Sequence, residues 1–291
     1  MNAGRIAILV DGGFFLKRLA RLVPAERCDT PANIVGCIRQ MCRQHIRMLT
    51  SSTDARWQQH VYRIFFYDAQ PYDGKAHHPV GNRPIDYARS DVARHRLELF
   101  ELLRKERKLA LRLGKVTRER DWTIAPELTK KLLRTREALA ALDGLDSTAV
   151  QAGTTSTLTL DPTAARQLLT LRDLWRSLDE HSVSLGLRQK GVDMRIGVDI
   201  ASLTLKKQVD TIILVAGDSD FVPAAKLARR EGIEFILDPL WQKVNPDLFE
   251  HIDGLQSGLK RPGSADEAAA ASTLQTSPGA TTTSSAVESD D

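Results

Sequence analysis

Of five aspartates that could do chemistry, four stand where buried strands, or the helices beside them, are expected to begin or end, and the fifth lies further along one of these helices. They are Asp11, Asp193, Asp199, Asp218 and Asp220. Carboxylates that gather at one edge of a sheet repel one another unless a positive charge lies among them. Hard divalent cations prefer oxygen ligands, which carboxylates supply. The five positions therefore predict a metal-dependent site.

Three of these aspartates follow apolar runs that are typical of buried strands. Asp11 ends the run 6–10, and Asp218 and Asp220 follow the run 211–216. Sites in open parallel sheets form outside the carboxyl ends of the strands, so these three side chains are expected to meet at one edge. Each also has a structural explanation when taken singly, because Asp218 can stabilise a turn and Asp220 can cap the following helix.

The other two aspartates are expected on one helix, residues 191–206. Asp193 lies in the first turn, where a carboxylate favours the positive end of the helix. Asp199 follows six residues later, so at about 100° per residue it lies on a different face. It shares a stripe with Ile196 and Leu203, which indicates that it leans toward the interior. A buried carboxylate needs a partner, which would be a metal reached through water, a cationic side chain or a backbone amide.

Apolar strands alternate with amphipathic helices over most of the chain. This alternation is typical of a mainly parallel sheet with right-handed crossovers. Residues 119–186 differ, since they show two helical patterns, 125–142 and 162–184, and we interpret them as a helical insertion. A polar loop is expected at 71–84. The predicted strands are 5–10, 60–67, 109–116, 209–216 and 233–237, and the predicted helices are 14–22, 31–49, 87–108, 191–206 and 221–231, with a short helix from Asn245.

One domain is expected over residues 1–258, followed by a tail at 259–291. The tail is rich in Ala, Ser, Thr, Gly and Pro, which is typical of disorder. No apolar stretch reaches the ~20 residues that a membrane-spanning helix needs, and the N-terminal run is too short for a signal peptide. The three cysteines form no Cys-x-x-Cys pair, which fits a reducing compartment. These observations predict a cytoplasmic protein that does not enter a membrane.

Positive charge is concentrated before the tail. Residues 1–260 carry 40 of the 41 lysines and arginines but only 32 of the 37 aspartates and glutamates, a net charge of +8. A basic body suits a polyanionic partner, although a solvated helix face with i,i+4 ion pairs would also account for many of these residues. The candidate substrate-binding residues are Lys190, Ser219, Lys226, Arg89 and Arg94.

Three segments resemble a known family. They read ILVDGGFF at 8–15, KGVDMRIGVDI at 190–200 and VAGDSDFVPAAKLARREG at 215–232. The chain resembles the NYN domain family of PIN-like nucleases, which includes the LabA-like proteins. The resemblance covers residues 5–116 and 187–255. It implies a three-layer α/β/α fold with an acidic pocket that binds Mg²⁺ or Mn²⁺ and cleaves RNA.

The same resemblance implies roles for the aspartates. Asp11, Asp193, Asp218 and Asp220 match the catalytic and metal-binding positions, and Asp199 matches a further acidic position. Many family members carry an asparagine two or three residues after the first aspartate, where this chain has Gly13 and Phe14. The expected activity is metal-dependent hydrolysis of RNA, with a metal-bound water assisted by a carboxylate as the nucleophile.

Two other functions are compatible with the sequence. A non-catalytic regulator could bind RNA or a protein through the helical insertion, whose leucines could also pack on a second subunit to give a homo-oligomer. A phosphatase with an aspartyl nucleophile is a weaker alternative, because Gly13 stands where that chemistry usually has a second aspartate. Metal-dependent cleavage of RNA would distinguish the expected ribonuclease from these two alternatives.

Overall fold

The computed structural model describes residues 5–51, 56–143, 151, 153, 155 and 158–261. The chain divides into two compact units. The first comprises Met1–Phe65 and Asp199–Asp291, and the second comprises Phe66–Val198. From position 262 onward the predicted tail lies outside the described residues.

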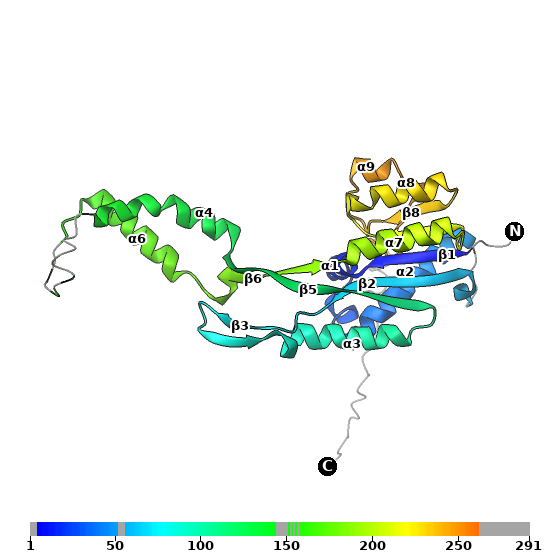
Figure 1. The fold of residues 1–291 in the computed structure, drawn as a ribbon, viewed down its shortest axis with the longest axis horizontal. Coiled ribbons are helices and arrows are strands. Elements are labelled where there is room, and N and C mark those ends of the chain that lie inside the picture. The colour runs from blue at the N-terminus through cyan, green and yellow to red at the C-terminus, as the bar shows by residue number, and fades with distance from the viewer. Residues whose placement is uncertain are drawn as a thin grey trace, which may run out of the picture. The chain divides into compact units, whose positions relative to one another are not determined.

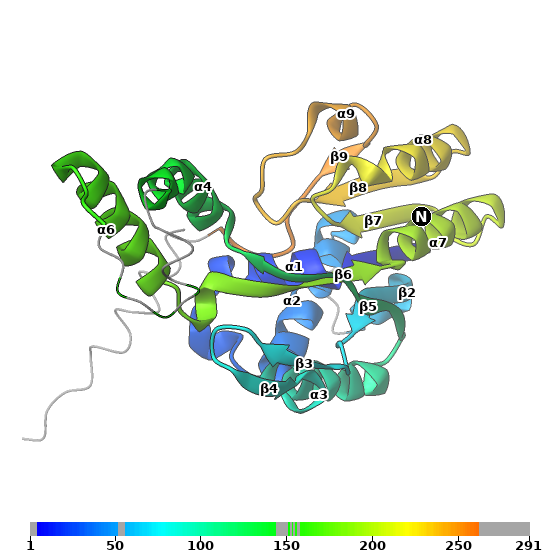
Figure 2. The same ribbon diagram turned by 60° about the vertical axis from the view of Figure 1, so that its left-hand side comes forward.

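Four parallel strands form the centre of the first unit: β1 (Ile6–Asp11), β7 (Thr211–Val215), β8 (Glu234–Asp238) and β9 (Gly254–Leu255) (Figure 2). Ile6 lies opposite Thr211, and Val10 lies opposite Val215. All of β7 and the first five residues of β1 are buried. Burial on both faces explains why these strands are continuous apolar runs.

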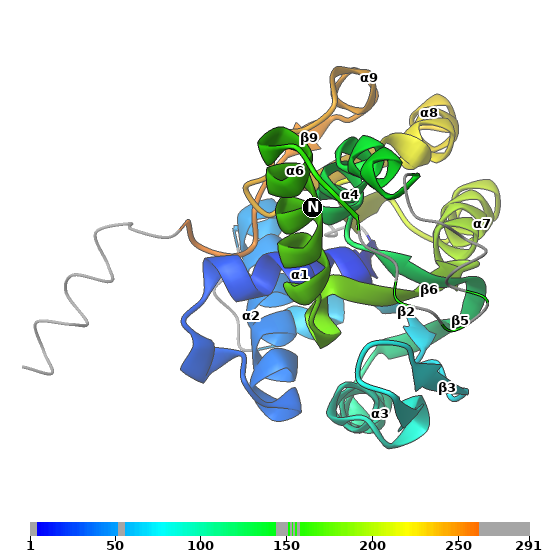
Figure 3. The same cartoon turned by 90° about the vertical axis from the view of Figure 1, so that its left-hand side faces the viewer.

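The helices of the first unit cover both faces of these strands, with α1 and α2 on one side and α8 on the other (Figure 3). Local signals set where they begin. Asp11 caps α1, Thr30 caps α2, and a proline stands within the first two positions of both α2 and α8. The helices are α1 (Gly12–Leu22), α2 (Pro31–Thr50), α8 (Val222–Arg230) and α9 (Pro246–Phe249), with the 3-10 helices η1 (Ala25–Arg27), η2 (Trp57–His60) and η6 (Ser219–Phe221).

The strand order is β6-β5-β2-β1-β7-β8-β9, which confirms the predicted α/β fold with a mainly parallel sheet. Strand β2 (Val61–Gln70) and helix α7 (Val192–Leu205) each cross from one unit into the other. The chain continues from β1 to β2 in one direction and from β7 to β8 in the other, so the order reverses between β1 and β7. Ligands of open α/β sheets bind in the crevice outside the carboxyl ends at such a reversal.

The second unit is built on an antiparallel pair, β5 (Leu109–Ile124) and β6 (Val183–Lys190), with helix α3 (Asp91–Lys105) packed against β5. A hairpin of β3 (Lys75–His78) and β4 (Arg83–Asp86) lies near the start of α3 (Figure 1). The other helices among the described residues of this unit are α4 (Pro126–Arg134), α6 (Pro162–Arg176), η3 (Tyr87–Arg89), η4 (Arg136–Leu142) and η5 (Glu180–Ser182). Helices α4 and α6 contact each other.

Two predictions for the second unit are wrong. The expected polar loop at 71–84 contains the β3–β4 hairpin, whose strands are short and half exposed and so lack the apolar alternation that marks a strand. The helical pattern expected at 162–184 stops at Arg176, where Ser177 caps α6, and Val183 begins β6. The predicted insertion thus starts and finishes with strand residues, and its described α-helices lie between 126 and 176. No helix among the described residues combines the length and apolarity that crossing a membrane requires.

Candidate active site

A cavity of about 560 Å³ opens in the first unit at the carboxyl ends of β1 and β7. This is the point where the strand order reverses. Two carboxylates line it, Asp11 from β1 and Asp218 from the turn after β7. The other polar lining residues are Lys17, Arg18, Arg21, Ser219, Gln242 and Asn245.

Asp11 is both the last residue of β1 and the cap of α1. Its Oδ1 accepts a hydrogen bond from the backbone N–H of Phe14 at 3.1 Å. The side chain is half-buried. Capping fixes the carboxylate where the strand turns into the helix, so a structural role also holds this side chain at the cavity.

Asp218 is held in the same manner at the end of β7. Its Oδ1 accepts from the backbone N–H of Asp220 at 3.1 Å, and its side chain is exposed. The preceding Gly217 lies so close to α1 that an added Cβ would come within 2.5 Å of Cε2 of Phe14. A glycine at 217 therefore lets the turn approach α1, and this approach brings Asp218 to the cavity that Asp11 lines.

The other predicted metal ligands are not among the residues that line this cavity. Asp220 is exposed on η6, next to the lining residues. Asp199 is half-buried on α7, as predicted, and Asp193 is exposed in the first turn of α7, in the second unit. Among the described residues, no group of three or more His, Cys, Asp or Glu side chains is arranged to hold a metal ion. The metal roles of Asp193, Asp199 and Asp220 stay predictions.

Helix α1 contributes three cations that the sequence analysis missed: Lys17, Arg18 and Arg21. Arg18 is fixed, since its Nε and Nη2 donate to the carbonyl oxygen of Leu240 at 3.1 and 2.6 Å. Lys17 and Arg21 are exposed and stand one helical turn apart. The sequence did contain a signal for these cations. Lys17 and Arg21 stand at i,i+4 in the helix that follows Asp11.

An unusual turn after β8 brings Gln242 to the cavity. Leu240 and Trp241 have φ of 45° and 63°, in the left-handed region that such bulky residues rarely adopt. Contacts hold this turn in place: Leu240 N–H donates to Asp238 Oδ1 at 2.8 Å, and Trp241 Nε1 donates to the carbonyl of Leu259 at 2.8 Å. No sequence signature of a left-handed turn marks these two residues, so Gln242 could not be predicted.

Of the five predicted substrate-binding residues, Ser219 lines the cavity. Lys226 is exposed on α8 and is not among the lining residues. The other three lie in the second unit and form ion pairs. Lys190 contacts Glu119 at 2.7 Å, a hydrogen bond that lowers the pKa of Glu119. Arg89 contacts Asp86 at 3.7 Å, and Arg94 pairs with Asp91.

The charges in the cavity differ from the expected self-repelling acidic cluster. Two carboxylates face three cations, so the positive charge that the aspartates need comes in part from α1. The donor set still fits a hard cation, because Mg²⁺ is commonly held by one or two carboxylates and completes its shell with waters and substrate phosphate oxygens. Asp11 and Asp218 with a bound phosphate match this description.

Comparison with known proteins supports the family resemblance. The NYN domain model matches residues 160–250, a span that includes Asp193, Asp199, Asp218 and Asp220. The predicted resemblance to the NYN domain family is confirmed where the two spans overlap, at residues 187–250, whereas its N-terminal part, with Asp11, lies outside the matched span. The match begins at residue 160, just before α6 and inside the segment that we interpreted as an insertion.

Two further comparisons identify no family. No curated protein matches the sequence. Among solved structures, a protein of unknown function from Vibrio parahaemolyticus is similar at 12% identity, over 88% of this chain and 93% of that one, with a TM-score of 0.36.

Proposed function

We propose that this protein is a metal-dependent ribonuclease whose active site is the cavity that Asp11 and Asp218 line. One observation carries the proposal. Carboxylates from the ends of two neighbouring parallel strands lie in one cavity with three cations, at the reversal of strand order. Carboxylates that can hold a cation, beside basic side chains that can bind phosphate, suit a phosphodiester substrate. The NYN match supports RNA as the substrate.

Asp11 and Asp218 would hold Mg²⁺ or Mn²⁺, with Asp193, Asp199 and Asp220 as further proposed ligands. The bound ion would supply an activated water and stabilise charge on the leaving oxygen. Lys17 and Arg21 would bind phosphates of the RNA strand. Arg18 would orient the strand while its guanidinium keeps its hydrogen bonds to the carbonyl oxygen of Leu240.

The remaining lining groups would position the substrate. The hydroxyl of Ser219 can donate to a non-bridging phosphate oxygen, and Gln242 offers an amide that can bind a ribose or base edge. We place the protein in the cytoplasm, where Cys28, Cys37 and Cys42 would persist as free thiols.

Cleavage of a labelled RNA pool by the full-length protein tests the proposal. We expect cleavage with Mg²⁺ or Mn²⁺, no cleavage with a chelator, and none by Asp218→Asn. Asp247→Asn, an exposed aspartate on α9 outside the lining, is the matched control and should cleave as the wild type does. Equal cleavage by Asp218→Asn and wild type would refute the proposed site.

A second candidate function, a non-catalytic regulator, is favoured by the surface of the helices between 126 and 176. Large apolar side chains are exposed there, which is uncommon unless a partner covers them. These side chains are Leu133, Leu139, Leu142, Leu169 and Trp175. A second copy of the chain would be one such partner.

A further inference from the structure

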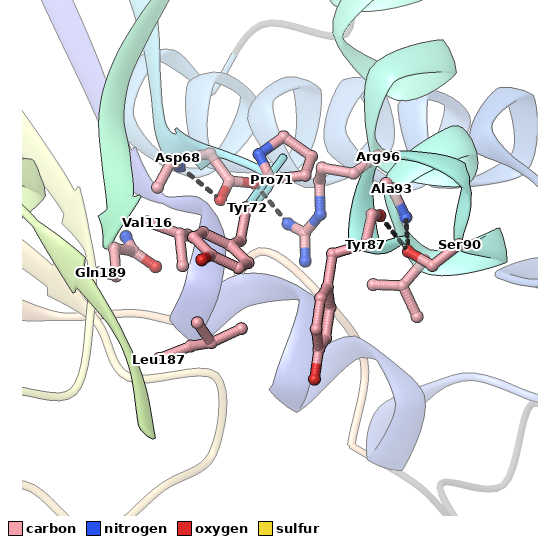
Figure 4. Close-up of a pocket in the computed structure, with 12 residues that line it drawn as sticks. Asp68, Pro71, Tyr72, Tyr87, Ser90, Ala93, Arg96, Val116, Leu187 and Gln189 are labelled. Carbon is pink, nitrogen blue, oxygen red and sulfur yellow. Dashed lines mark hydrogen bonds and ion pairs between the residues drawn. The ribbon is translucent and has the colours of Figure 1, made fainter. Parts of the chain in front are cut away.

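The second unit contains a cavity of about 360 Å³ that the proposed chemistry does not use (Figure 4). The end of β2, the start of α3, and β5 and β6 all contribute to its walls. Its lining is mostly apolar, with few polar groups. Small-molecule sites commonly combine a cavity of about this size with such a lining.

Two tyrosines form the aromatic part of the wall. The ring centroids of Tyr72 and Tyr87 are 5.5 Å apart, with planes inclined at 63°. Both side chains are half-buried, and burial raises the pKa of the Tyr87 hydroxyl. Val116 and Leu187 supply aliphatic surface from the β5–β6 pair. Aromatic faces set at an angle and backed by aliphatic carbon suit a flat ring better than a flexible chain.

A partly buried ion pair places one cation in this apolar setting. Asp68 is 4% exposed, and its Oδ1 accepts from the backbone N–H of Ala69 at 2.8 Å. Its Oδ2 accepts from Nη1 of Arg96. The guanidinium of Arg96 projects toward the space between the two tyrosine rings (Figure 4). A guanidinium has five N–H donors, so Arg96 can donate to a ligand while it stays paired with Asp68.

The polar groups determine which ring would fit. Arg96 requires an acceptor on the ring, and the Gln189 amide at the rim can pair with a donor or an acceptor. Asp68 offsets the charge of Arg96, so a full anion gains less here than at an unpaired arginine. The apolar lining also disfavours a hydrated phosphate. A planar ring that carries carbonyl oxygens satisfies all of these conditions.

We propose that this cavity binds a nucleobase that carries a carbonyl oxygen, such as uracil or guanine. The ring would lie against Tyr72 and Tyr87 and accept a hydrogen bond from Arg96. The base could come from an RNA strand or from a free nucleotide. RNA as the source rests on the proposed function, whereas the choice of ring rests only on this cavity.

Equilibrium binding to the full-length protein in chelator, where cleavage is suppressed, tests the proposal. The ligands are UMP, GMP, ribose 5-phosphate and short U-rich and G-rich RNAs, and the variants are Tyr87→Ala, Tyr87→Phe and Arg96→Leu. Tyr62→Ala, a half-buried tyrosine of the first unit outside the cavity, is the control. We expect at least one of the two nucleotides to bind and ribose 5-phosphate not to bind. Stacking predicts on the order of tenfold weaker binding for Tyr87→Ala and near-normal binding for Tyr87→Phe.

The outcomes separate this proposal from the ribonuclease. Equal binding of ribose 5-phosphate and the nucleotides, or unchanged binding by Tyr87→Ala, would overturn it. Binding of nucleotides that the RNAs do not compete away would assign the site to a free nucleotide and overturn RNA as the source. Base binding that persists in Asp218→Asn, or in a wild type that cleaves nothing, would uphold this site by itself.

Discussion

At the residue scale, capping and chemistry share the same side chains. Asp11 and Asp218 each accept one backbone N–H and line one cavity, so capping does not argue against a functional role. Both could be predicted from sequence, because carboxyl ends of parallel strands converge. The cations on α1 could not be ranked above the many other basic residues, since the facing of a helix is set by packing that one sequence does not reveal.

Lys17 and Arg21 should contribute to RNA affinity through phosphate contacts. We expect the double variant Lys17→Ala/Arg21→Ala to bind RNA more weakly and to reduce the salt dependence of binding by about 0.7 per lost contact. Lys206→Ala is the matched control, an exposed lysine just after α7 that is outside the cavity lining. Affinity titrated against salt is the measurement. A salt slope that stays at the wild-type value in the double variant would contradict the assignment.

Gly217 should be intolerant of a side chain. Gly217→Ala would place a methyl 2.5 Å from the Phe14 ring, and such overpacking typically costs about 1–3 kcal/mol in the free energy of unfolding. Gly36→Ala is the control, because a Cβ at Gly36 in α2 meets nothing within 4 Å and should stabilise the helix by about 0.5–1 kcal/mol. Urea unfolding measures both. Equal effects of the two substitutions would count against the packing of the turn on α1.

Cys42 should be inert in the folded protein. It is fully buried, and burial raises its pKa to about 12, so below that pH the thiolate that reacts with electrophiles is scarce. We expect iodoacetamide at pH 8 to modify the half-exposed Cys28 first and Cys42 only after unfolding, as mapped by mass spectrometry. Early modification of Cys42 in the native protein would disagree with this burial.

At the scale of elements, a buried polar network ties the C-terminal segment of the first unit to its core. Asp238, at the end of β8, pairs with Nε2 of His45 on α2 at 2.8 Å, and both are fully buried. It also accepts from Ser257 Oγ at 3.0 Å and from the N–H of Gly258 at 2.9 Å. Three segments that are distant in the sequence thus meet at one carboxylate.

Removal of His45 should therefore be costly. Removing one partner of a buried hydrogen bond leaves the other polar group unsatisfied, which typically costs about 1–3 kcal/mol. We expect a loss of this size in the free energy of unfolding for His45→Leu, measured with denaturant. His77→Leu, on an exposed hairpin strand, should change it by less than about 0.5 kcal/mol. A small loss in His45→Leu would refute a stabilising role.

The elements that could be predicted well from the sequence are those in which the pattern of buried residues and the local capping or turn residues indicate the same structure. The fully buried β1 and β7 are apolar runs, and α2 begins at a threonine cap followed by a proline. The strands that were not predicted show neither a buried apolar run nor a local signal for where they begin. β6 is mostly exposed and follows a helix directly, and β9 has two residues, so only pairing with a neighbour defines them.

At the scale of the whole molecule, the described part of each unit contains a cavity with its own chemistry. The cavity of the first unit holds carboxylates and cations, which suit a phosphodiester, and that of the second is lined by aromatic rings and apolar surface. The net charge of +8 over residues 1–260 suits a polyanion that would engage several basic residues. These features favour a nucleic acid as the partner.

The helices between 126 and 176 allow a test of self-association. Leu133 is 63% and Trp175 is 56% exposed, so charged replacements there should not disturb the fold. If a second copy covers these residues, Leu133→Glu/Trp175→Glu should dissociate an oligomer of the wild type, as measured by sedimentation velocity. A wild type that sediments as a monomer at all concentrations would contradict self-association through these residues.

The central claim is that Asp11 and Asp218 form a catalytic site rather than two helix caps. Single-turnover cleavage of labelled RNA in Mg²⁺ or Mn²⁺, with RNA binding measured in parallel, tests it most directly. For Asp11→Asn and Asp218→Asn, which keep a capping oxygen, we predict cleavage slower by a factor on the order of 100 or more and RNA binding close to the wild type. Wild-type cleavage rates in both variants would contradict the claim.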